Sequence, residues 1–363
     1  MKTILISTSR FGTPIPDYFK YLGDKFNKNN FSVIFVFDGN IKEFPPAQKN
    51  VKYFSYPNKR PTGLKDFIFL YKIIKQEKPI LCISNFGSTN IVTLASLLLR
   101  VSNRINYLHT SPYQLLIDSK KNNISKWILK KRKSLILKTN THIITNSNKM
   151  SELITHFFEL KKSNISVMPY LLKDDKRPKK KFREREKKIC IVGRLAPSKG
   201  HKELLYSFAN CRDIHSDIEL LIVGEGPEEK NLKKLSRLLK LNKQINFVGS
   251  IPNKDIGKIF SKCLASISAS RSEAFGIVSI ESLKEGTPIL STDTEGSRDI
   301  LKEGENGLII NLNKKNDFSE KLTEIIDNWD VFSKNALRTF ENKFSNKNIN
   351  DHYEKFINEI LIL

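Results

Sequence analysis

The stretch LASISASRSEAFGIVSIESLKEGTPILST, residues 264–292, decides the fold of this chain. LASISAS consists of apolar residues and the small residue Ser, without any charged side chain, which predicts a buried strand. IVSIESLKEG has a helical pattern and closes at Gly286, since glycine readily ends a helix. PILST then supplies a second buried strand. This order of strand, helix and strand predicts parallel strands covered by helices.

The same alternation extends through the rest of the chain in both directions. Residues 173–188 interrupt it, because they hold ten basic and four acidic residues with almost nothing apolar, which is typical of a linker. We therefore expect an α/β protein with two Rossmann-like domains, 1–172 and 189–340, facing each other across a cleft where ligands bind. The expected strands are 3–8, 31–37, 51–56, 80–86, 105–110, 142–147 and 165–170 in the first domain, and 189–193, 218–224, 245–249, 264–270, 288–292 and 307–310 in the second.

The length of 363 residues suits two hydrophobic cores, and the composition is that of a globular protein. No apolar stretch is long enough to span a bilayer, and the N-terminal sequence MKTILISTSRFGTP reads as a first strand and not as a signal peptide. The four cysteines have no CxxC spacing, which argues against a disulfide framework and against a zinc site. A cytoplasmic protein is the resulting expectation.

The net charge of +24 is placed unevenly along the chain. Residues 1–190 hold 37 Lys and Arg against 13 Asp and Glu, whereas residues 191–363 hold 25 of each. This asymmetry predicts that the first domain meets an anionic partner, such as a membrane surface, a polyanionic substrate or nucleic acid. A general lysine bias on solvated faces is the alternative, but it predicts an excess in both halves.

Two cations stand near a helix start in GRLAPSKG, residues 193–200. Gly193 permits a turn after a strand, and Arg194 and Lys199 flank the entry to the following helix. This arrangement favours a diphosphate, because the helix dipole, the free amides and the side chains all attract negative charge. The alternative is a capped helix whose Arg and Lys are only solvated.

Two carboxylates, Glu273 and Glu281, lie in the loop and the helix of the opening stretch. Carboxylates accept hydrogen bonds from sugar hydroxyls, and a nucleotide sugar has hydroxyls on both sides of its diphosphate. Carboxylates beside a diphosphate-binding site therefore suit a nucleotide sugar. For each glutamate taken alone, a solvated helix residue is the alternative.

Six motifs, in this order and spacing, resemble the retaining glycosyltransferases of family 4, which have the GT-B fold: GRLAPSKG, VGEGP, FVGSIPN, SRSEAFGIVSIE, GTPILST and EGSRDILKEGENGLI. The resemblance is strong over residues 189–310 and looser over the N-terminal half. It implies that Glu273 contacts hydroxyls of the donor sugar and that Glu281 contacts the nucleotide ribose. It also implies that Arg194 and Lys199 hold the donor diphosphate, and that residues 341–363 form a helix packing on the first domain.

The resemblance adds further residues to this expected site. His109 matches the family's N-domain histidine, which faces the donor sugar, although a lone histidine after an apolar strand would otherwise read as structural. The expected catalytic residues are Glu273, Arg194, Lys199 and His109. The expected substrate-binding residues are Gly12, Gly193, Gly249, Ser250, Ile251, Ala274, Phe275, Gly276, Ile277 and Glu281.

The expected enzyme is a glycosyltransferase without a cofactor, whose donor is a UDP-sugar or, alternatively, a GDP-sugar. No Asp-x-Asp pair stands at a strand end for a bridging metal, so Arg194, Lys199 and helix amides would neutralise the leaving diphosphate. The resemblance implies transfer with retention. A nucleotide-sugar epimerase is one rival, because it shares the plan and needs no acceptor. A basic nucleic-acid-binding protein is the less favoured rival, because the two glutamates at the ligand-binding site would repel a phosphate backbone.

The segment ISKWILKKRKSLILK, residues 124–138, predicts a basic helix with an apolar stripe, which fits either an anionic bilayer or the core of the first domain. With a bilayer, the acceptor would be a lipid-linked or growing saccharide in bacterial surface polysaccharide or lipopolysaccharide synthesis. The expected partners are then a nucleotide sugar, a saccharide acceptor and an anionic membrane, without nucleic acid. The expected location is peripheral, at the inner face of the cytoplasmic membrane.

Overall fold

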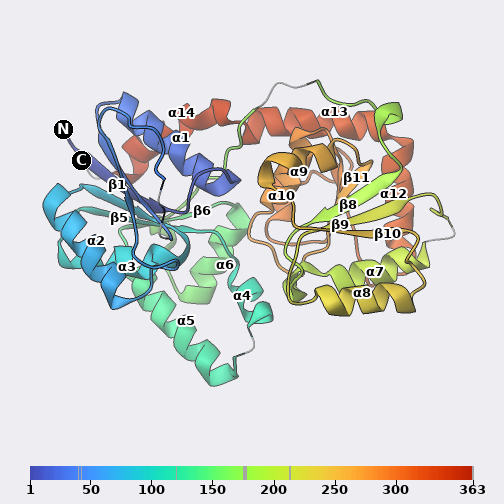
Figure 1. Cartoon of the computed structure of the whole chain (residues 1–363), viewed down its shortest axis with the longest axis horizontal. Helices are drawn as coiled ribbons and strands as arrows, with labels where there is room; N and C mark the ends of the chain where they lie inside the picture. The colour runs from blue at the N-terminus through green and yellow to red at the C-terminus, as the bar shows by residue number, and fades with distance from the viewer. Residues whose placement is uncertain (40, 42, 120, 175–177, 212–213, 362–363) are drawn as a thin grey trace. The chain divides into compact units, whose positions relative to one another are not determined.

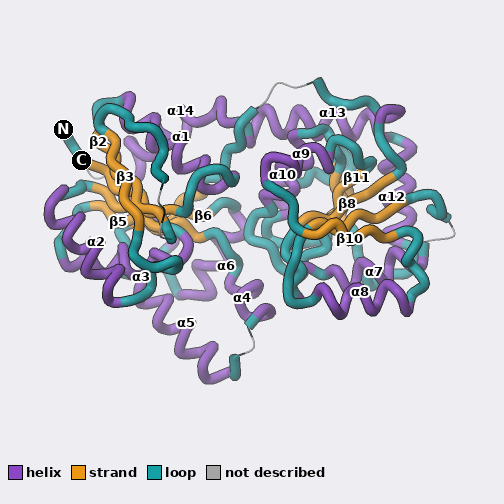
Figure 2. Tube along the Cα trace, in the orientation of Figure 1, coloured by secondary structure: helices purple, strands orange, loops and turns teal. Residues whose placement is uncertain are grey.

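The computed structural model describes residues 1–39, 41, 43–119, 121–174, 178–211 and 214–361. The chain divides into two compact units. Unit 1 comprises Met1–His109, Lys121–Leu172 and Asn346–Leu363, and unit 2 comprises Thr110–Lys120 and Lys173–Ser345. In each unit the strands form a central layer and the helices cover both of its faces, as Figure 1 and Figure 2 show.

Unit 1 is built on a seven-stranded sheet with the order β3-β2-β1-β4-β5-β6-β7, and every neighbouring pair is parallel. The strands lie inside or beside the stretches that the sequence predicts, because apolar runs bury both faces of each central strand. Their bounds are β1 (Thr3–Thr8), β2 (Ser32–Phe37), β3 (Val51–Ser55), β4 (Leu81–Ser84), β5 (Asn103–Leu108), β6 (His142–Thr145) and β7 (Ile165–Val167).

Helices cover the two faces of this sheet. They are α1 (Pro14–Lys28), α2 (Leu64–Glu77), α3 (Thr89–Leu98), α5 (Asn123–Lys138), α6 (Asn148–Phe158) and α14 (Ile349–Lys355). The C-terminal helix α14 packs on α1, where Tyr18 Oη and His352 Nδ1 lie 2.9 Å apart in a hydrogen bond. The last segment of the chain is thereby fixed to unit 1.

Unit 2 is built on a six-stranded parallel sheet with the order β10-β9-β8-β11-β12-β13. Its strands are β8 (Lys188–Val192), β9 (Glu219–Val223), β10 (Ile245–Gly249), β11 (Ala265–Ser268), β12 (Ile289–Ser291) and β13 (Gly307–Ile309). Its helices are α4 (Pro112–Asp118), α7 (His201–Asn210), α8 (Glu229–Leu238), α9 (Asn253–Phe260), α10 (Ile277–Lys284), α11 (Ser297–Ile300), α12 (Asp317–Asp327) and α13 (Trp329–Thr339). The expected α/β class with two parallel sheets is confirmed. No helix in the described part of the chain is long and apolar enough to cross a bilayer.

The expected linker, 173–188, is attached to unit 2. The buried Arg185 guanidinium donates hydrogen bonds to the carbonyl oxygens of Phe260, Cys263 and Glu285, at 2.7–2.9 Å. It also lies 4.8 Å from the ring centre of Trp329. Composition alone suggests a solvated segment, but one arginine in it satisfies several carbonyls of the second core. Residues 175–177 of this segment lie outside the described residues.

Two further boundaries differ from the sequence expectation. Residues 110–120 group with unit 2, although the sequence suggests a first domain of 1–172. The second unit also continues to Ser345 and not to residue 340, because the short helix Phe340–Phe344 stays with it. There the rings of Phe344 and Phe275 meet edge to face, with centres 6.0 Å apart.

Candidate functional site

A cavity of about 220 Å³ opens in unit 2 at the carboxyl ends of β8 and β11. These two strands are neighbours in the sheet, and the chain runs outward from β8 through β9 to β10 before it returns to β11. Such a reversal of strand order leaves a crevice between the loops, which is where parallel α/β sheets bind ligands. The cavity wall combines the loop after β8, the start of α7, the loop after β11 and the start of α10.

Lys199 and Glu273 meet in this cavity. Lys199 Nζ donates a hydrogen bond to Glu273 Oε2, and both side chains are largely shielded from solvent. Ser270 Oγ donates a second hydrogen bond to the same carboxylate oxygen, at 3.3 Å. Glu273 is therefore held by two donors from two different loops.

Gly200 allows the Lys199 loop to approach the end of β11. Its φ is +65°, and a Cβ at this position would lie 1.8 Å from the carbonyl oxygen of Ala269. Any larger residue would push the two loops apart, because backbone atoms cannot yield as a flexible side chain does. The glycine thus places Lys199 beside the loop that carries Glu273.

Five of the predicted site residues lie on the wall of this cavity: Gly193, Arg194, Lys199, Glu273 and Gly276. Arg194 is exposed, and Gly276, with φ +88°, caps α10 at its start. The predicted cations and one predicted acid are thus brought together in one unit. Cations and a carboxylate in one cavity can form charge-assisted hydrogen bonds with an anionic group and with a hydroxyl.

Other predicted residues lie around the cavity and not on its wall. The side chains of Ala274 and Phe275 are buried, so only their backbone could face a ligand. Ile277 is the first residue of α10. In the loop after β10, Ser250 N lies 3.4 Å from Glu225 Oε1, Ile251 packs against the core beneath β8, and Gly249 has a φ of +78°.

Glu281 lies one turn further along α10 and is not part of the cavity wall. Burial raises the pKa of its carboxyl to about 7, and the neighbouring Lys284 opposes this shift only in part. Of the two glutamates, only Glu273 therefore lines the cavity. Glu281 is a carboxyl whose charge depends on pH near neutrality.

His201 is a cavity residue that sequence reasoning missed. It is the first residue of α7, it is 3% exposed, and neither ring nitrogen has a hydrogen-bond partner among the described residues. Burial, followed by the charge of Lys199, lowers the pKa of its imidazole to about 4. Its position directly after Lys199-Gly200 was the only available signal, and a buried residue at the first turn of a helix is usually apolar.

His109 and Gly12 belong to unit 1. His109 follows β5, stacks on Phe86 with ring centres 4.5 Å apart, and is hydrogen-bonded through Nδ1 to the Tyr170 hydroxyl. Burial lowers the pKa of His109 to about 3, and its buried Nε2 has no partner among the described residues. The amide of Gly12 donates to Asp17 Oδ1 at 2.8 Å, so it is already occupied.

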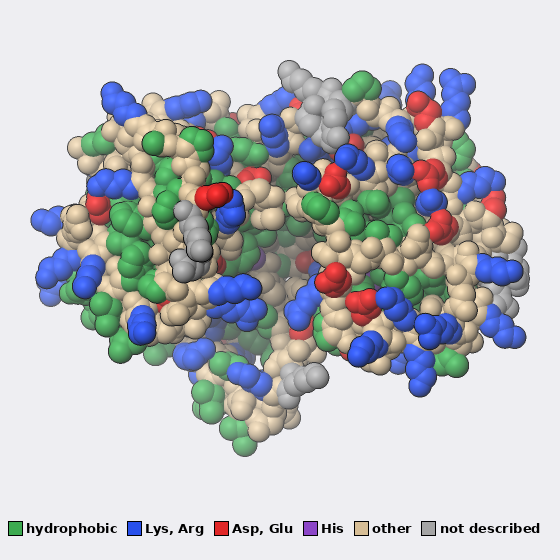
Figure 3. Space-filling model, viewed as in Figure 1, with side chains coloured by type: hydrophobic (Ala, Val, Ile, Leu, Met, Phe, Trp, Pro, Cys, Tyr) green, Lys and Arg blue, Asp and Glu red, His purple; other side chains and the backbone are tan. Residues whose placement is uncertain are grey.

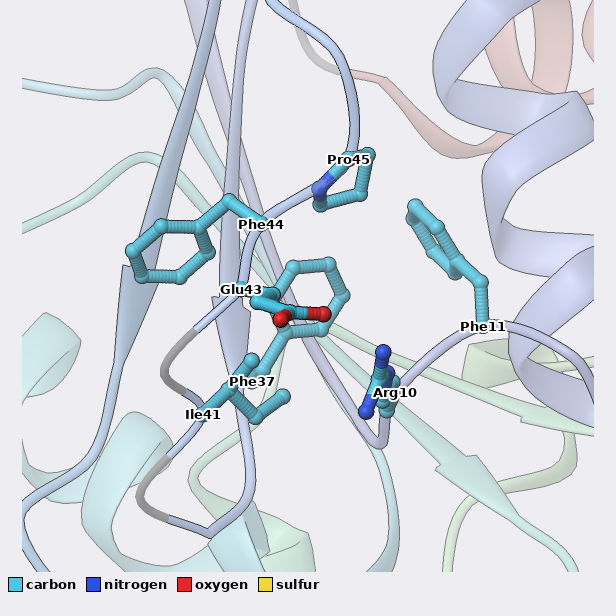
Figure 4. Close-up of a pocket in the computed structure, with 7 residues that line it drawn as sticks. All are labelled: Arg10, Phe11, Phe37, Ile41, Glu43, Phe44 and Pro45. Atoms are coloured by element: carbon cyan, nitrogen blue, oxygen red, sulfur yellow. The ribbon is translucent and has the colours of Figure 1, made fainter.

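Unit 1 has its own cavity, of about 160 Å³, at the carboxyl ends of β1 and β2. Its walls are mainly aromatic and apolar, with Arg10 and Glu43 as the charged groups, as Figure 4 shows. The rings of Phe44 and Phe37 are inclined by 24° with centres 6.5 Å apart, and Phe11 meets Phe37 edge to face at 4.9 Å. This volume, like the 220 Å³ of the unit 2 cavity, is below the 300–1,000 Å³ or so of a typical small-molecule site, so each cavity suits one part of a larger ligand.

No group of three or more His, Cys, Asp or Glu side chains within the described ranges is arranged to hold a metal ion.

Comparison with known proteins agrees with this geometry. Residues 173–344 match the family described as "Glycosyl transferases group 1", and this range covers most of unit 2, including the whole cavity. An uncharacterized glycosyltransferase of Methanocaldococcus jannaschii is 24% identical, over 96% of this chain and 94% of that protein. The lipopolysaccharide core biosynthesis glycosyltransferase LpsE of Rhizobium meliloti is 28% identical, over 46% of this chain and 48% of its own length.

Among solved structures, the Anabaena protein Alr3699/HepE in complex with UDP and glucose superposes with a TM-score of 0.77 at 15% identity, covering 97% of this chain and 98% of that one. This similarity extends to both sheets and establishes the GT-B fold. Residues 173–344, which make up most of unit 2, are accordingly similar to the group 1 glycosyltransferase domains.

Proposed function

We propose that this protein transfers a sugar from a nucleotide-diphosphate sugar to an acceptor hydroxyl, with retention of configuration and without a metal, as a member of glycosyltransferase family 4. The observation that carries the proposal is the pairing of Lys199 with Glu273 in a cavity that Arg194 also lines, within the residues that are similar to the group 1 glycosyltransferase domains. UDP is the favoured nucleotide, since Alr3699/HepE is described in complex with UDP and glucose.

The paired state of Lys199 suggests how the donor enters. A diphosphate competes with Glu273 for the ammonium group, because it presents more negative charge and more acceptor oxygens. Release from Lys199 leaves the carboxylate free to accept hydrogen bonds from hydroxyls of the donor sugar. Arg194, Lys199 and the amides at the start of α10 then stabilise the charge that develops on the leaving diphosphate.

The test is a thermal-stability screen with UDP- and GDP-sugars, followed by transfer of labelled sugar with and without saccharide acceptors. A ligand that binds only the folded state raises the melting temperature. We expect stabilisation by a UDP-sugar and acceptor-dependent labelled product. Formation of an altered free sugar nucleotide without any acceptor would instead identify the rival epimerase.

We propose that a saccharide acceptor places one sugar unit in the aromatic cavity of unit 1. The support is its position at the carboxyl ends of β1 and β2 and its composition, with flat rings for the apolar face of a sugar. Arg10 and Glu43 are available for hydroxyls at the rim.

We further propose that α5 contacts an anionic membrane surface, where a lipid-linked saccharide would serve as acceptor in cell-surface polysaccharide synthesis. Four of its apolar residues are exposed: Ile124 at 71%, Trp127 at 59%, Ile128 at 53% and Leu135 at 66%. The core side of α5 is formed by Ser134, Ile136 and Leu137 instead. The helix thus packs on the core, as the alternative expects, but these four residues are not part of that contact.

The same helix carries Lys126, Lys130, Lys131 and Arg132, of which Lys131 and Arg132 are exposed, whereas Lys133 is largely buried. Figure 3 shows apolar side chains at the free end of α5 with Lys and Arg side chains nearby. An apolar stripe flanked by cations is the pattern of a helix that lies in a lipid interface.

A further inference from the structure

Residues 110–119, which we call the strap, reach unit 2 from the part of the chain that follows β5. They include helix α4 and are hydrogen-bonded to the cavity loops at two points. Asp118 Oδ1 accepts from Ser198 N at 3.0 Å, and Asp118 Oδ2 accepts from Ser198 Oγ at 3.0 Å. Ser272 Oγ donates to Ser111 Oγ at 2.8 Å. Ser111, Ser198 and Ser272 are all almost completely buried.

The two serines held by the strap stand directly before the two residues that meet in the cavity. Ser198 precedes Lys199, and Ser272 precedes Glu273. The loops are also joined to each other, because Arg271 N donates to Ser198 O at 2.8 Å. Glu295 completes the connection, since its carboxylate lies 3.3 Å from both Ser272 Oγ and Glu273 N.

The physical effect of these contacts is to fix a short element that has little support of its own. Lys199 ends a single turn of 3-10 helix, Pro197–Lys199, which has no side-chain cap at its N-terminus. Hydrogen bonds to a carboxylate are about twice as strong as neutral ones, and Asp118 makes two of them to the middle residue of this turn. The adjacent ammonium group is thereby restricted to the region of Glu273.

We propose that Asp118 and Ser111 are positioning residues of the donor site, and that the strap holds Lys199 and Glu273 in their working geometry. This inference rests on the proposed function for its kinetic consequence, but its structural part stands on the strap contacts alone. Neither strap residue lines the cavity, so both act through Ser198 and Ser272 and do not touch the donor themselves.

The first experiment measures loop order without any ligand. Asp118→Ala is compared with the wild type by hydrogen exchange of the peptides that cover 196–200 and 270–276. We expect faster exchange in both peptides, because the loops lose a shared anchor. Asp217→Ala is the matched control, since it removes an exposed carboxylate that pairs with Lys187 at the amino ends of β8 and β9. Unchanged exchange in Asp118→Ala would overturn the strap.

The second experiment measures turnover of a UDP-sugar and binding of UDP. A misplacement of about 1 Å can cost about 10²-fold in rate, so we expect kcat of Asp118→Ala to fall by about tenfold or more. Asp118→Asn, which keeps one acceptor for Ser198 N, should recover part of the loss. In a Lys199→Ala background, Asp118→Ala should add little, because it acts through Lys199; fully additive losses would contradict the proposal.

The outcomes separate the two ideas. If the wild type neither binds UDP nor turns over a UDP-sugar while Asp118→Ala still loosens both loops, the proposed function fails and the strap stands. If the wild type is active and Asp118→Ala matches Asp217→Ala in exchange and in kcat, the strap fails and the proposed function stands.

Discussion

Lys199 donates a hydrogen bond to Glu273 across 74 residues of sequence, and in doing so joins the loop after β8 to the loop after β11. The pair is a cation and an anion that both line the proposed donor cavity. In the unliganded protein each satisfies the other. A donor that carries both a diphosphate and sugar hydroxyls offers a new partner to Lys199 and to Glu273. The pair therefore favours such a donor over a ligand that carries only one of these groups.

The first prediction concerns these charges. Lys199→Ala or Arg194→Ala should lower kcat for sugar transfer by about 10²-fold or more, as removal of one charge-stabilising group does at other transition states. Steady-state kinetics with a UDP-sugar measures this. Lys262→Ala is the control, because that exposed lysine pairs with Glu186 just before β11, at the opposite edge of the sheet. Near-normal kcat in either cavity variant would refute the assigned role.

The second prediction concerns the pH dependence of donor binding. Burial raises the pKa of Glu281 to about 7, so the folded protein keeps a proton there that the unfolded chain has lost. Folding stability from this group should therefore fall as the pH rises from about 4.5 to 7. Hydroxyls of a ribose donate to the charged form, so UDP-sugar affinity should rise by up to about tenfold between pH 6 and 8.

Glu281→Gln tests this assignment, because it removes the titration and keeps the shape. Its UDP-sugar affinity should be nearly flat over the same pH range in calorimetry. A UDP-sugar is used in place of UDP because the terminal phosphate of UDP titrates near pH 6 by itself. An equally steep profile in Glu281→Gln would assign the dependence to another group.

The third prediction concerns stability. Arg185→Ala should lower the free energy of unfolding of unit 2 by about 3 kcal/mol or more, because the carbonyls of Phe260, Cys263 and Glu285 lose a buried charged donor. Burial lowers the pKa of Arg185 to about 10, so the charge persists at neutral pH. Urea unfolding measures the loss. The exposed neighbour Arg183, changed to Ala, should cost little by comparison.

The fourth prediction concerns the membrane. A triple change of Ile124, Trp127 and Ile128 to Ser should weaken binding to anionic liposomes by at least about tenfold, since each large apolar side chain contributes about 1.5–3 kcal/mol when buried in lipid. Sedimentation with vesicles at low and high salt measures it. Leu238→Ser, at an exposed leucine of unit 2, is the control. Equal binding by the triple variant, or none by the wild type at low salt, would exclude α5 as the anchor.

The fifth prediction concerns the acceptor. Phe44→Ala should raise KM for the saccharide acceptor found in the transfer screen by about tenfold, because it removes one aromatic wall of the unit 1 cavity. The affinity for UDP should stay within about twofold. Leu64→Ala, at an exposed leucine at the start of α2, is the control in the same unit. An unchanged acceptor KM would place the acceptor elsewhere.

Much of the fold follows from local sequence. Apolar runs such as SVIFVF, which forms β2, are long enough to be buried on both faces and too short for helices, so the strands could be located without coordinates. The motif GRLAPSKG likewise placed Arg194 and Lys199 on the cavity wall, because a strand end followed at once by a helix start leaves little freedom between them.

Contacts between distant segments could not be predicted in this way. Arg185 looked solvated because its neighbours are charged, and only the packed core shows the carbonyls that it satisfies. For His201 the sequence offered only its position directly after Lys199 and Gly200. The grouping of Ser111 and Asp118 with unit 2 depends on hydrogen bonds to residues 80 to 161 positions away.

The amino-acid sequence by itself determined the parallel α/β class, the strands and the loops that carry the charges, because these depend on periodicity and on residues adjacent in the chain. The tertiary structure decided which of those charges share a cavity, that Glu281 lies off its wall, and that the apolar stripe of α5 is exposed. These outcomes depend on burial and on close approach between loops, and burial is a property of the packed chain as a whole.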